Sequence, residues 1–485
     1  VTCIEEMANV KKNANEQKKK VSCSTDFIKD EKVLSIIRQR LSVREEEKNL
    51  NGEVFTPIEL ICEMFDHLPK DVWTNPDLKW LDPANGIGNF PVIAYYKLFE
   101  LLKTKIPNSA KRSKHIIENM LYMVELNSVN VRVCKKIFNM IDGKANPNIV
   151  KHDFLTFKGF KGIDKFDVIM GNPPYNSGGI KSKNTKKVVK NQQGFKTIWP
   201  IFVDKSIGLL NDNKYLLFIN PATWIGLKSS NSKMFLNNQI LILRFYDIRE
   251  APKLFGNLSA EIPLTYYLLQ KSKTNKNTLI FDKCLDKFVS FNIYNNKFIP
   301  IEAISLQGKL KEFSLKYGSL EKKYSTCKNN TDIKKDKNSE YKYPLVNISR
   351  GNIEITYTKK NNNKNTENKL VLPNDSMGYP LLDENGTLYP SNAHDHILYS
   401  NNNLKELKQL QNYFYTSLLF YLINITKLSQ KFFEYKVFHI LPDITKMTNK
   451  EDINDEDLIK LFKLDKEDIK CIEKYKQKGE GRLST

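Results

Sequence analysis

The first half of the chain alternates between two hydrophobic patterns. Short, mainly apolar runs with the length and composition of buried parallel strands occur at residues 78–81, 120–124, 148–151 and 166–171. Apolar side chains at every third or fourth position predict helices at residues 58–68, 91–103 and 129–140. This alternation predicts an α/β fold with a parallel, Rossmann-like sheet.

The sheet is expected to continue beyond these elements. The pattern predicts a helix at residues 197–210 and strands at 215–219 and 240–246. Residues 262–269 and 279–281 are expected to pair with each other, antiparallel, and to close the sheet. Between them and the preceding strand, Phe255 is expected as an exposed aromatic on a loop.

The pattern changes beyond residue 294, where polar segments rich in Asn and Lys separate short β-like runs at 345–348 and 353–357. One helix is expected at 404–427 and two short ones within 452–476. Together with an N-terminal polar arm and a helix at 32–48, this predicts four parts. They are the arm and helix (1–50), a catalytic domain (51–293), a second domain (294–445) and a C-terminal helical appendage (446–485).

The strand that ends at Gly171 is followed by a segment that cannot continue it. Pro173 and Pro174 donate no backbone N–H, and each pushes the residue before it towards extended geometry. The segment therefore leaves the sheet as a stiff ledge that carries the Asn172 amide and the Tyr175 ring. Ligands of open α/β sheets bind at the carboxyl ends of strands, so this is a candidate catalytic site. By itself it also fits an ordinary strand followed by a Pro-Pro turn.

Acidic residues and glycines follow the other predicted strands. Asp82 ends the first strand and leads into a turn containing Gly86 and Gly88, which is the first strand–turn–helix unit of a nucleotide-binding sheet. Glu125 and Asp153 follow the next two strands. Any one acid fits a surface position, but the set converges on one edge of a parallel sheet. Upstream, Thr56 is predicted to cap a helix whose first residue is Pro57, which offers free N–H groups to an anionic ligand.

Charge and cysteine content narrow the class of partner and compartment. Lys and Arg number 76 against 55 Asp and Glu, a net charge of +21. Such an excess favours a nucleic-acid partner, although an A/T-rich genome would also enrich Lys and Asn. The seven cysteines are scattered without a C-x-x-C pair, so we expect neither a zinc site nor a disulfide framework, and an intracellular, reducing compartment. No apolar run reaches the roughly 18 residues of a membrane span, and residues 1–20 lack the apolar core of a secretory signal.

The combined motifs resemble the S-adenosylmethionine-dependent N6-adenine DNA methyltransferases of restriction–modification systems, in the order of the γ class. The resemblance covers residues 50–285 and rests on Phe-Thr-Pro, Asp-Pro-Ala-x-Gly-x-Gly-Asn-Phe, the acid at 125 and Asn-Pro-Pro-Tyr. It implies an α/β, Rossmann-like, seven-stranded methyltransferase sheet whose last strand is antiparallel. A C-terminal mixed α+β target-recognition domain (294–445) would then bind the DNA.

The resemblance also assigns roles to individual residues. The expected catalytic residues are Asn172, Pro173, Pro174 and Tyr175, and Phe255 would join Tyr175 in stacking on the target base. The residues expected to hold S-adenosyl-L-methionine are Phe55, Thr56, Pro57, Asp82, Ala84, Gly86, Gly88, Glu125 and Asp153. Within this set, Glu125 would bind the ribose hydroxyls and Asp153 the adenine amine. Asn85 departs from the family, which more often has a small residue there. No metal is implied.

The chemistry of the ledge agrees with this resemblance. An adenine N6 amine is a poor nucleophile because its lone pair is delocalised into the ring. Acceptors on its two N–H bonds, the Asn172 side-chain oxygen and the Pro173 carbonyl, would stabilise the positive charge that develops on it. Tyr175 would stack on a base rotated out of double-stranded DNA. The activated methyl group needs positioning more than acid–base help, so the absence of a conspicuous catalytic His or Cys is expected.

Other readings stay open at this point. Asn-Pro-Pro-Tyr could also hold other substrates that offer a similar nitrogen. These are the N4 amine of cytosine, the amine of adenine in RNA and the side-chain amide of glutamine in a protein. The long segment after residue 294 and the net charge of +21 favour DNA over a protein substrate. A catalytically inactive DNA-binding subunit is disfavoured because cofactor and catalytic motifs are both present. A restriction endonuclease partner, where there is one, is expected on a separate chain.

Overall fold

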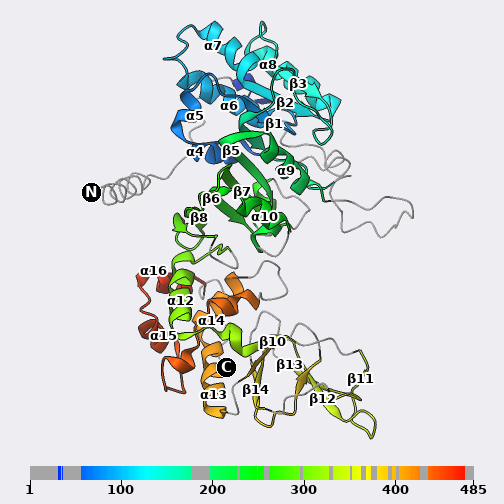
Figure 1. The fold of residues 1–485 in the computed structure, drawn as a ribbon, viewed down its shortest axis with the longest axis vertical. Helices are drawn as coiled ribbons and strands as arrows, with labels where there is room; N and C mark the ends of the chain where they lie inside the picture. Colours follow the sequence, from blue (N-terminus) through cyan, green and yellow to red (C-terminus); the bar gives the residue numbers. More distant parts are fainter. Residues whose placement is uncertain are drawn as a thin grey trace. The chain divides into compact units, whose positions relative to one another are not determined.

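The computed structural model divides into two compact units (Figure 1). The first comprises residues 1–224 and 229–278, and the second residues 225–228 and 279–485. The residues that the structure describes are 31–33, 35–36, 56–176, 197–226, 230–247, 250–255, 262–294, 299–326, 331–349, 352–361, 367–372, 380–391, 396–399, 403–426 and 435–475. Phe55 and most of the predicted helix at 32–48 lie outside them. The predicted boundaries at residues 50, 293 and 445 stay predictions.

The first unit alternates helices and strands as predicted (Figure 1). Its helices are α4 (Ile58–Asp66), α5 (Lys70–Thr74), α6 (Asn89–Leu101), α7 (Ser109–His115), the π-helical turn η1 (Ile116–Met120), α8 (Ser128–Ile141), α9 (Trp199–Leu209), α10 (Ser230–Leu236) and α11 (Ala251–Leu254). Its strands are β1 (Trp80–Asp82), β2 (Leu121–Glu125), β3 (Asn148–Lys151), β4 (Phe166–Gly171), β5 (Leu210–Pro221), β6 (Gln239–Tyr246) and β7 (Leu264–Gln270).

The central sheet has nine strands rather than the seven expected, and seven of them lie in this unit, in the order β3-β2-β1-β4-β5-β7-β6. The first five of these pair in parallel, and β7 is antiparallel to both β5 and β6. The predicted α/β class and the antiparallel last strand are therefore confirmed. The predicted pairing of residues 262–269 with 279–281 is wrong. Because β7 is inserted between β5 and β6, both of its edges are already occupied.

The middle of the sheet is covered on both faces. Every residue of β1, β2 and β4 is buried, because side chains alternate between the two faces of a strand and each face meets packed structure. Helices α6 and α8 both contact β2. Burial on both faces explains why these strands are continuous apolar runs in the sequence rather than alternating ones. It also explains why the polar residues lie at the carboxyl ends of these strands.

The second unit contains the remaining elements. Its helices are α12 (Ile304–Tyr317), α13 (Leu404–Tyr415), α14 (Ser417–Ile425), α15 (Asp455–Leu461) and α16 (Lys466–Tyr475), with short 3-10 turns η3 (Leu320–Lys323), η4 (Tyr435–His439) and η5 (Ile444–Lys446). Strand β8 (Thr278–Asp282) begins at the last residue of the first unit, and β9 (Lys287–Phe291) follows. Two small sheets have the orders β10-β17-β14-β15 and β11-β13-β12-β16. Their strands are β10 (Tyr324–Thr326), β11 (Ile333–Lys334), β12 (Tyr343–Ser349), β13 (Asn352–Thr358), β14 (Lys369–Leu372), β15 (Leu381–Asp383), β16 (Tyr389–Pro390) and β17 (His396–Tyr399).

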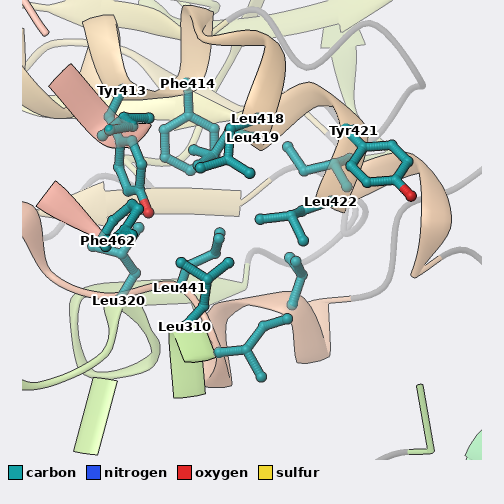
Figure 2. Close-up of a cluster of buried hydrophobic side chains, with 14 of the residues drawn as sticks. Leu310, Leu320, Tyr413, Phe414, Leu418, Leu419, Tyr421, Leu422, Leu441 and Phe462 are labelled. Atoms are coloured by element: carbon teal, nitrogen blue, oxygen red, sulfur yellow. The ribbon is translucent and has the colours of Figure 1, made fainter. Parts of the chain in front are cut away.

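A cluster of apolar side chains forms the core of the second unit (Figure 2). Leu310 of α12 and Leu418 of α14 are completely or almost completely buried in it, as is Phe462 at the end of α15. The single helix predicted at 404–427 is wrong, because Thr416 interrupts it with extended backbone. The Thr416 hydroxyl caps α14 by accepting from the Leu419 N–H at 3.3 Å. The break lets two short helices line one core.

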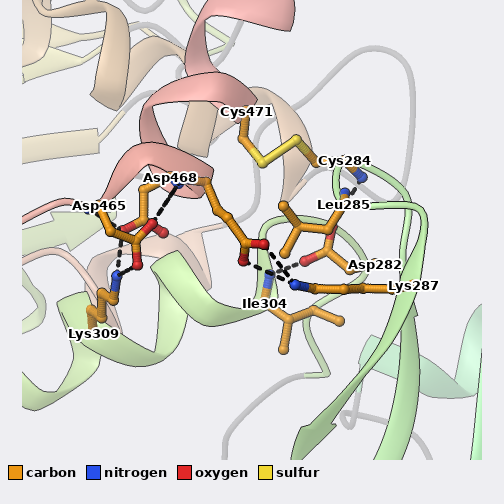
Figure 3. A network of polar contacts seen from close by, with 10 residues as sticks. Asp282, Cys284, Leu285, Lys287, Ile304, Lys309, Asp465, Asp468 and Cys471 are labelled. Carbon is orange, nitrogen blue, oxygen red and sulfur yellow. Dashed lines mark hydrogen bonds and ion pairs between the residues drawn. A yellow bond between two sulfur atoms is a disulfide. The ribbon is translucent and has the colours of Figure 1, made fainter. Parts of the chain in front are cut away.

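A disulfide joins Cys284 to Cys471 within the second unit (Figure 3). The bond links the turn after β8 to α16, and its Cα atoms are 5.6 Å apart. Lys309 of α12 also binds this helix region, through ion pairs with Asp465 and Asp468 at 2.5 Å. The expectation of no disulfide is therefore wrong for this pair. The two cysteines are 187 residues apart in sequence, and only the tertiary fold brings them together.

The described part of the chain contains neither a membrane-spanning helix nor a metal-binding cluster. None of its helices combines the length and the apolar character that crossing a membrane requires. Within those same residues, no three side chains of the His, Cys, Asp or Glu type are grouped in a way that could hold a metal ion.

Candidate active site

The carboxyl ends of three neighbouring strands carry the predicted site. Strand β1 lies between β2 and β4 and pairs in parallel with both, with Leu81 opposite Tyr122 on one side and Ile169 on the other. Asp82 is the last residue of β1, Glu125 the last of β2 and Gly171 the last of β4. Parallel pairing therefore brings these predicted residues to one edge of the sheet.

Asp82 is a buried carboxyl group, with a side chain that is only 1% exposed. Burial raises its pKa well above the usual range, and the nearby carboxylate of Glu125 raises it further. A hydrogen bond from the Ala84 N–H to Oδ1, at 3.1 Å, works in the opposite direction. An acid kept in this environment is expected to have a functional reason for being there.

The glycine turn between β1 and α6 depends on Glu125. Gly86 and Gly88 have φ values of 55° and 98°, which favour glycine. The turn is tied down by the Asn85 N–H, which donates to the Val124 carbonyl at 3.2 Å, and by the Gly88 N–H, which donates to the Asn85 carbonyl at 2.8 Å. The Gly86 N–H donates to Glu125 Oε2 at 2.7 Å, so the acid at the end of β2 also holds this turn.

Glu125 is 8% exposed, and its two oxygens both accept from the backbone. In addition to the bond from Gly86, Oε1 accepts from the Asn127 N–H at 2.7 Å. Each carboxylate oxygen has more than one lone pair, so these bonds leave acceptor capacity for a ligand hydroxyl. Two backbone N–H groups thus fix the orientation of the carboxylate in advance.

The Thr56–Pro57 segment differs in detail from the prediction. Helix α4 begins at Ile58, Pro57 is its N-cap residue, and no side chain caps it. Pro57 has extended backbone, with ψ 148°, so it cannot be the first helical residue. The Thr56 side chain is buried instead, and the Thr56 carbonyl accepts from Asn89 Nδ2 at 3.1 Å. The capping role predicted for Thr56 is therefore wrong.

Asn89 is a residue that sequence reasoning did not single out. It is the first residue of α6 and is 4% exposed. Among the described residues, neither Asn89 Oδ1 nor Thr56 Oγ1 has a hydrogen-bond partner, although both atoms are buried. Buried polar atoms without a partner are costly, so such a pair marks a place where a ligand can bind. The signal in the sequence was an amide directly after the second glycine of the turn.

The Asn-Pro-Pro-Tyr segment starts directly where β4 ends. Pro173 is buried, and Asn172, Pro174 and Tyr175 are half-buried. The Tyr175 carbonyl accepts from the Ile198 N–H at 3.0 Å, which fixes the chain on the far side of residues 177–196 to the same place. Burial raises the pKa of the Tyr175 hydroxyl, and the nearby Asn172 side chain counteracts part of that rise. Among the described residues, the Tyr175 hydroxyl is buried without a hydrogen-bond partner.

Asp153 and Phe255 occupy different kinds of position. Asp153 is exposed after β3, and its Oδ1 accepts from the Leu155 N–H at 2.9 Å. Phe255 directly follows α11 and is only 6% exposed, so the prediction of an exposed aromatic there is wrong. The apolar ring gains more from packing against the protein than from contact with water. The role of Phe255 in base stacking stays a prediction.

Comparisons with known proteins find relatives of this region. Residues 70–255 match the model described as Eco57I restriction-modification methylase. A relative from Mycoplasma pneumoniae, named "Uncharacterized adenine-specific methylase", is 29% identical over 326 residues, which are 51% of this chain and 74% of that protein. The type II methyltransferase M.VspI of a Vibrio species is 29% identical over 205 residues. That match covers 42% of this chain and 45% of M.VspI, so the chain spans less than half of that relative.

Two solved structures show a weaker similarity to this chain. The M protein of the type I restriction enzyme EcoKI is 14% identical, with a TM-score of 0.36 and 49% coverage of each chain. The type IIL restriction-modification enzyme MmeI, solved in complex with DNA, is 12% identical with a TM-score of 0.45, covering 91% of this chain and 78% of MmeI. The match to the family model is the more specific finding: residues 70–255 of this chain are similar to the Eco57I restriction-modification methylases.

Proposed function

We propose that the chain is a site-specific DNA methyltransferase that transfers the methyl group of S-adenosyl-L-methionine to the N6 amine of a flipped-out adenine. The observation that carries the proposal is the start of Asn-Pro-Pro-Tyr at the end of β4, beside the strand ends that carry Asp82 and Glu125. Relatives named as an adenine-specific methylase and as type II methyltransferases support adenine as the target base.

The residues of the edge fit the cofactor. The glycine turn at Gly86 and Gly88 allows close approach of a ligand to the backbone. The buried oxygens of Thr56 and Asn89 would accept hydrogen bonds from an ammonium group, such as that of the methionine end. Glu125 would accept from the ribose hydroxyls and Asp153 from the adenine amine. When bound, the cofactor supplies a methyl group on a positively charged sulfur.

The remaining members of the site have supporting roles. Asp82, Ala84 and Pro57 would line the methionine end with Phe55, which lies outside the described residues. The raised pKa of Asp82 favours its protonated, neutral form in the protein without ligand. A neighbouring ammonium group would favour the ionised form, so binding of that group is expected to release the proton from Asp82.

The target amine would be held by the ledge. Asn172 Oδ1 and the Pro173 carbonyl would accept from its two N–H bonds, which favours the geometry in which the nitrogen lone pair can attack. Pro174 keeps the ledge stiff because its ring fixes the backbone. The half-buried Tyr175 ring would stack on the base.

Double-stranded DNA is the proposed partner of the whole chain. The net charge of +21 favours binding to phosphates, and residues 294–445 are proposed as the target-recognition domain. A restriction endonuclease, if the system contains one, would be a separate chain. The enzyme would work inside a cell, where its DNA is.

The test is methylation by the full chain in cells without other DNA methyltransferases. N6-methyladenine at one sequence motif, mapped by single-molecule sequencing, is the expected result. Asn172→Ala should abolish the modification, and the exposed Asn139 of α8 provides a matched control as Asn139→Ala. N4-methylcytosine instead would reassign the base. Full methylation by purified Asn172→Ala would refute the proposed mechanism.

A further inference from the structure

Lys205 makes an unusual set of hydrogen bonds near the cofactor edge. It lies on α9, and its Nζ donates to the carbonyls of Phe154 at 2.6 Å, Leu155 at 3.2 Å and Phe157 at 2.6 Å. A lysine ammonium group has three N–H donors, so these bonds use all of them. One side chain thus holds three backbone carbonyls of a single turn, those of residues 154, 155 and 157.

That turn begins at Asp153. The Asp153 carbonyl accepts from the Phe157 N–H at 2.9 Å, and Asp153 Oδ1 accepts from the Leu155 N–H at 2.9 Å. The conformation of the turn therefore determines where the Asp153 carboxylate points. Because Lys205 binds the carbonyls on the other side of the same turn, it holds the orientation of this carboxylate indirectly.

Packing and charge strengthen the attachment. Lys205 Nζ lies 4.9 Å from the centroid of the buried Phe154 ring. The Phe154 ring stacks on that of Phe202, which like Lys205 belongs to α9, with 5.3 Å between the ring centroids. Burial lowers the pKa of Lys205, and the nearby carboxylate of Asp153 counteracts the loss of charge. The turn is therefore fixed to α9 by hydrogen bonds, by aromatic packing and by charge.

Helix α9 also reaches the catalytic segment. The N–H groups of Ile198 and Trp199, at its start, donate to the Tyr175 carbonyl at 3.0 and 3.4 Å. Lys205 lies further along the same helix. One rigid element thus connects the motif proposed to hold the target base with the turn proposed to hold the cofactor.

We propose that Lys205 is a positioning residue that holds Asp153 in place to recognise the exocyclic amine of the cofactor's adenine. This inference rests on the proposed function, because it requires the cofactor to bind at this edge. A hydrogen bond to a charged group changes affinity by about tenfold to a hundredfold. The protein should therefore bind a ligand with the adenine amine more tightly than one without it, by about that factor, and should lose this preference when Lys205 no longer holds the turn.

The experiment compares S-adenosylhomocysteine with S-inosylhomocysteine, in which an oxygen replaces the amine. Dissociation constants are measured by calorimetry on the full chain and on Lys205→Met, which keeps the aliphatic stem but removes the donors. Lys205→Met should bind both ligands with similar affinity. Lys165→Met is the matched control, because Lys165 also donates to a backbone carbonyl, but to that of Gly208 in α9. The preference of this variant should equal that of the unmodified protein.

The outcomes separate this inference from the proposed function. Failure of the unmodified protein to bind either ligand would refute the cofactor assignment itself. Binding of both ligands without a preference for the amine would refute the role of Asp153, and with it this inference, but not cofactor binding. An equal preference in Lys205→Met and the unmodified protein would refute the inference alone. If Lys205→Met does not fold, Lys205→Gln replaces it, because its amide keeps two donors. A reduced preference in Lys205→Gln supports the inference, and an unchanged preference overturns it.

Discussion

The carboxylate of Asp82 lies directly against the backbone of Gly171. A Cβ atom placed on Gly171 would lie 2.9 Å from Asp82 Oδ1, and Gly171 has a φ of +147°, which L side chains rarely adopt. The contact joins the buried acid at the end of β1 to the residue immediately before Asn172. Any side chain at position 171 must therefore displace either the acid or the start of the catalytic segment.

Gly171→Ala should reduce both stability and methyl transfer. The added methyl group meets the Asp82 carboxylate in a region where every neighbouring strand residue is buried, and overpacking of this kind typically costs about 1–3 kcal/mol. We expect a decrease of that size in the free energy of unfolding, and more than a tenfold loss of transfer rate because the Asn172 amide is displaced. Denaturant unfolding and transfer of labelled methyl groups to DNA measure the two effects.

Gly208→Ala is the matched control for this substitution. Gly208 lies in α9, and a Cβ atom there meets nothing within 4 Å. Because alanine favours helix more than glycine does, stability should be unchanged or should rise by up to about 1 kcal/mol. Equal effects of the two substitutions would contradict the steric role assigned to Gly171.

A second steric pair can be tested with a double-mutant cycle. A Cβ atom on Gly88 would lie 2.7 Å from Cys134 Sγ, and Gly88 has a φ of +98°. Gly88→Ala should destabilise the protein through both the clash and the backbone strain. Adding Cys134→Ala removes the clash. The free energy of unfolding of the double variant should therefore exceed the value expected from adding the two single changes by roughly 1 kcal/mol or more. Additive effects in denaturant unfolding would show that the thiol does not limit this position.

The sequence allowed the strands at residues 148–151 and 166–171 to be predicted to the residue, because clear signals end them. Gly171 and the two prolines stop β4, and the acids after β2 and β3 mark the functional edge. The glycine turn was also predictable, since glycine adopts positive φ values at little cost. These features are local, and local chemistry is what a single sequence records most directly.

Features that depend on distant segments could not be predicted in the same way. The position of β7 between β5 and β6 follows from how the whole sheet assembles, not from any residue within β7. The break at Thr416 depends on the core that α13 and α14 share. Likewise, the role inferred for Lys205 appears only when α9 lies beside the turn after β3. A lysine on a helix has no sequence signal that separates this position from a solvated one.

His67 should make the stability of the first unit depend on pH. Its Nε2 lies 3.0 Å from the hydroxyl of Tyr266, which donates to Glu63 at 2.6 Å. Burial lowers the pKa of His67 to about 4, whereas an unfolded chain keeps a value near 6.5. The neutral form is therefore favoured by folding. Its contribution, up to about 3 kcal/mol, is complete above pH 6.5 and is lost as the pH falls from 6.5 towards 4.

His67→Gln isolates this contribution, because glutamine keeps an N–H donor for Tyr266 but does not titrate. The free energy of unfolding is measured from pH 7.5 to 4.5 for both proteins. The other titratable groups are the same in the unmodified protein and in His67→Gln. The free energy of unfolding of the unmodified protein should therefore fall more than that of His67→Gln over this range. Parallel pH profiles would show that His67 is not buried in its neutral form.

The disulfide between Cys284 and Cys471 should stabilise the second unit. It closes a segment with a sequence separation of 187 residues, and in the chain-entropy model a loop of that length contributes about 5 kcal/mol by restricting the unfolded state. Addition of dithiothreitol should therefore lower the unfolding temperature of this unit in calorimetry. The double variant Cys284→Ser/Cys471→Ser should have the lower temperature with or without reductant. Mass spectrometry of unreduced peptides checks that the bond is present.

The ion pairs around α16 predict how much structure survives reduction. Lys309 binds Asp465 and Asp468, and Lys287 binds Glu467 at 2.8 Å, so charge attaches this helix to α12 and β9 independently of the disulfide. Phe462 and Ile472 add buried apolar contacts. We therefore expect the reduced protein to keep its far-ultraviolet circular dichroism at low salt and to unfold at a lower temperature. Free thiols at Cys284 and Cys471 in the unreduced protein, or an unfolding temperature that does not respond to the reductant, would contradict the stabilising role of the bond.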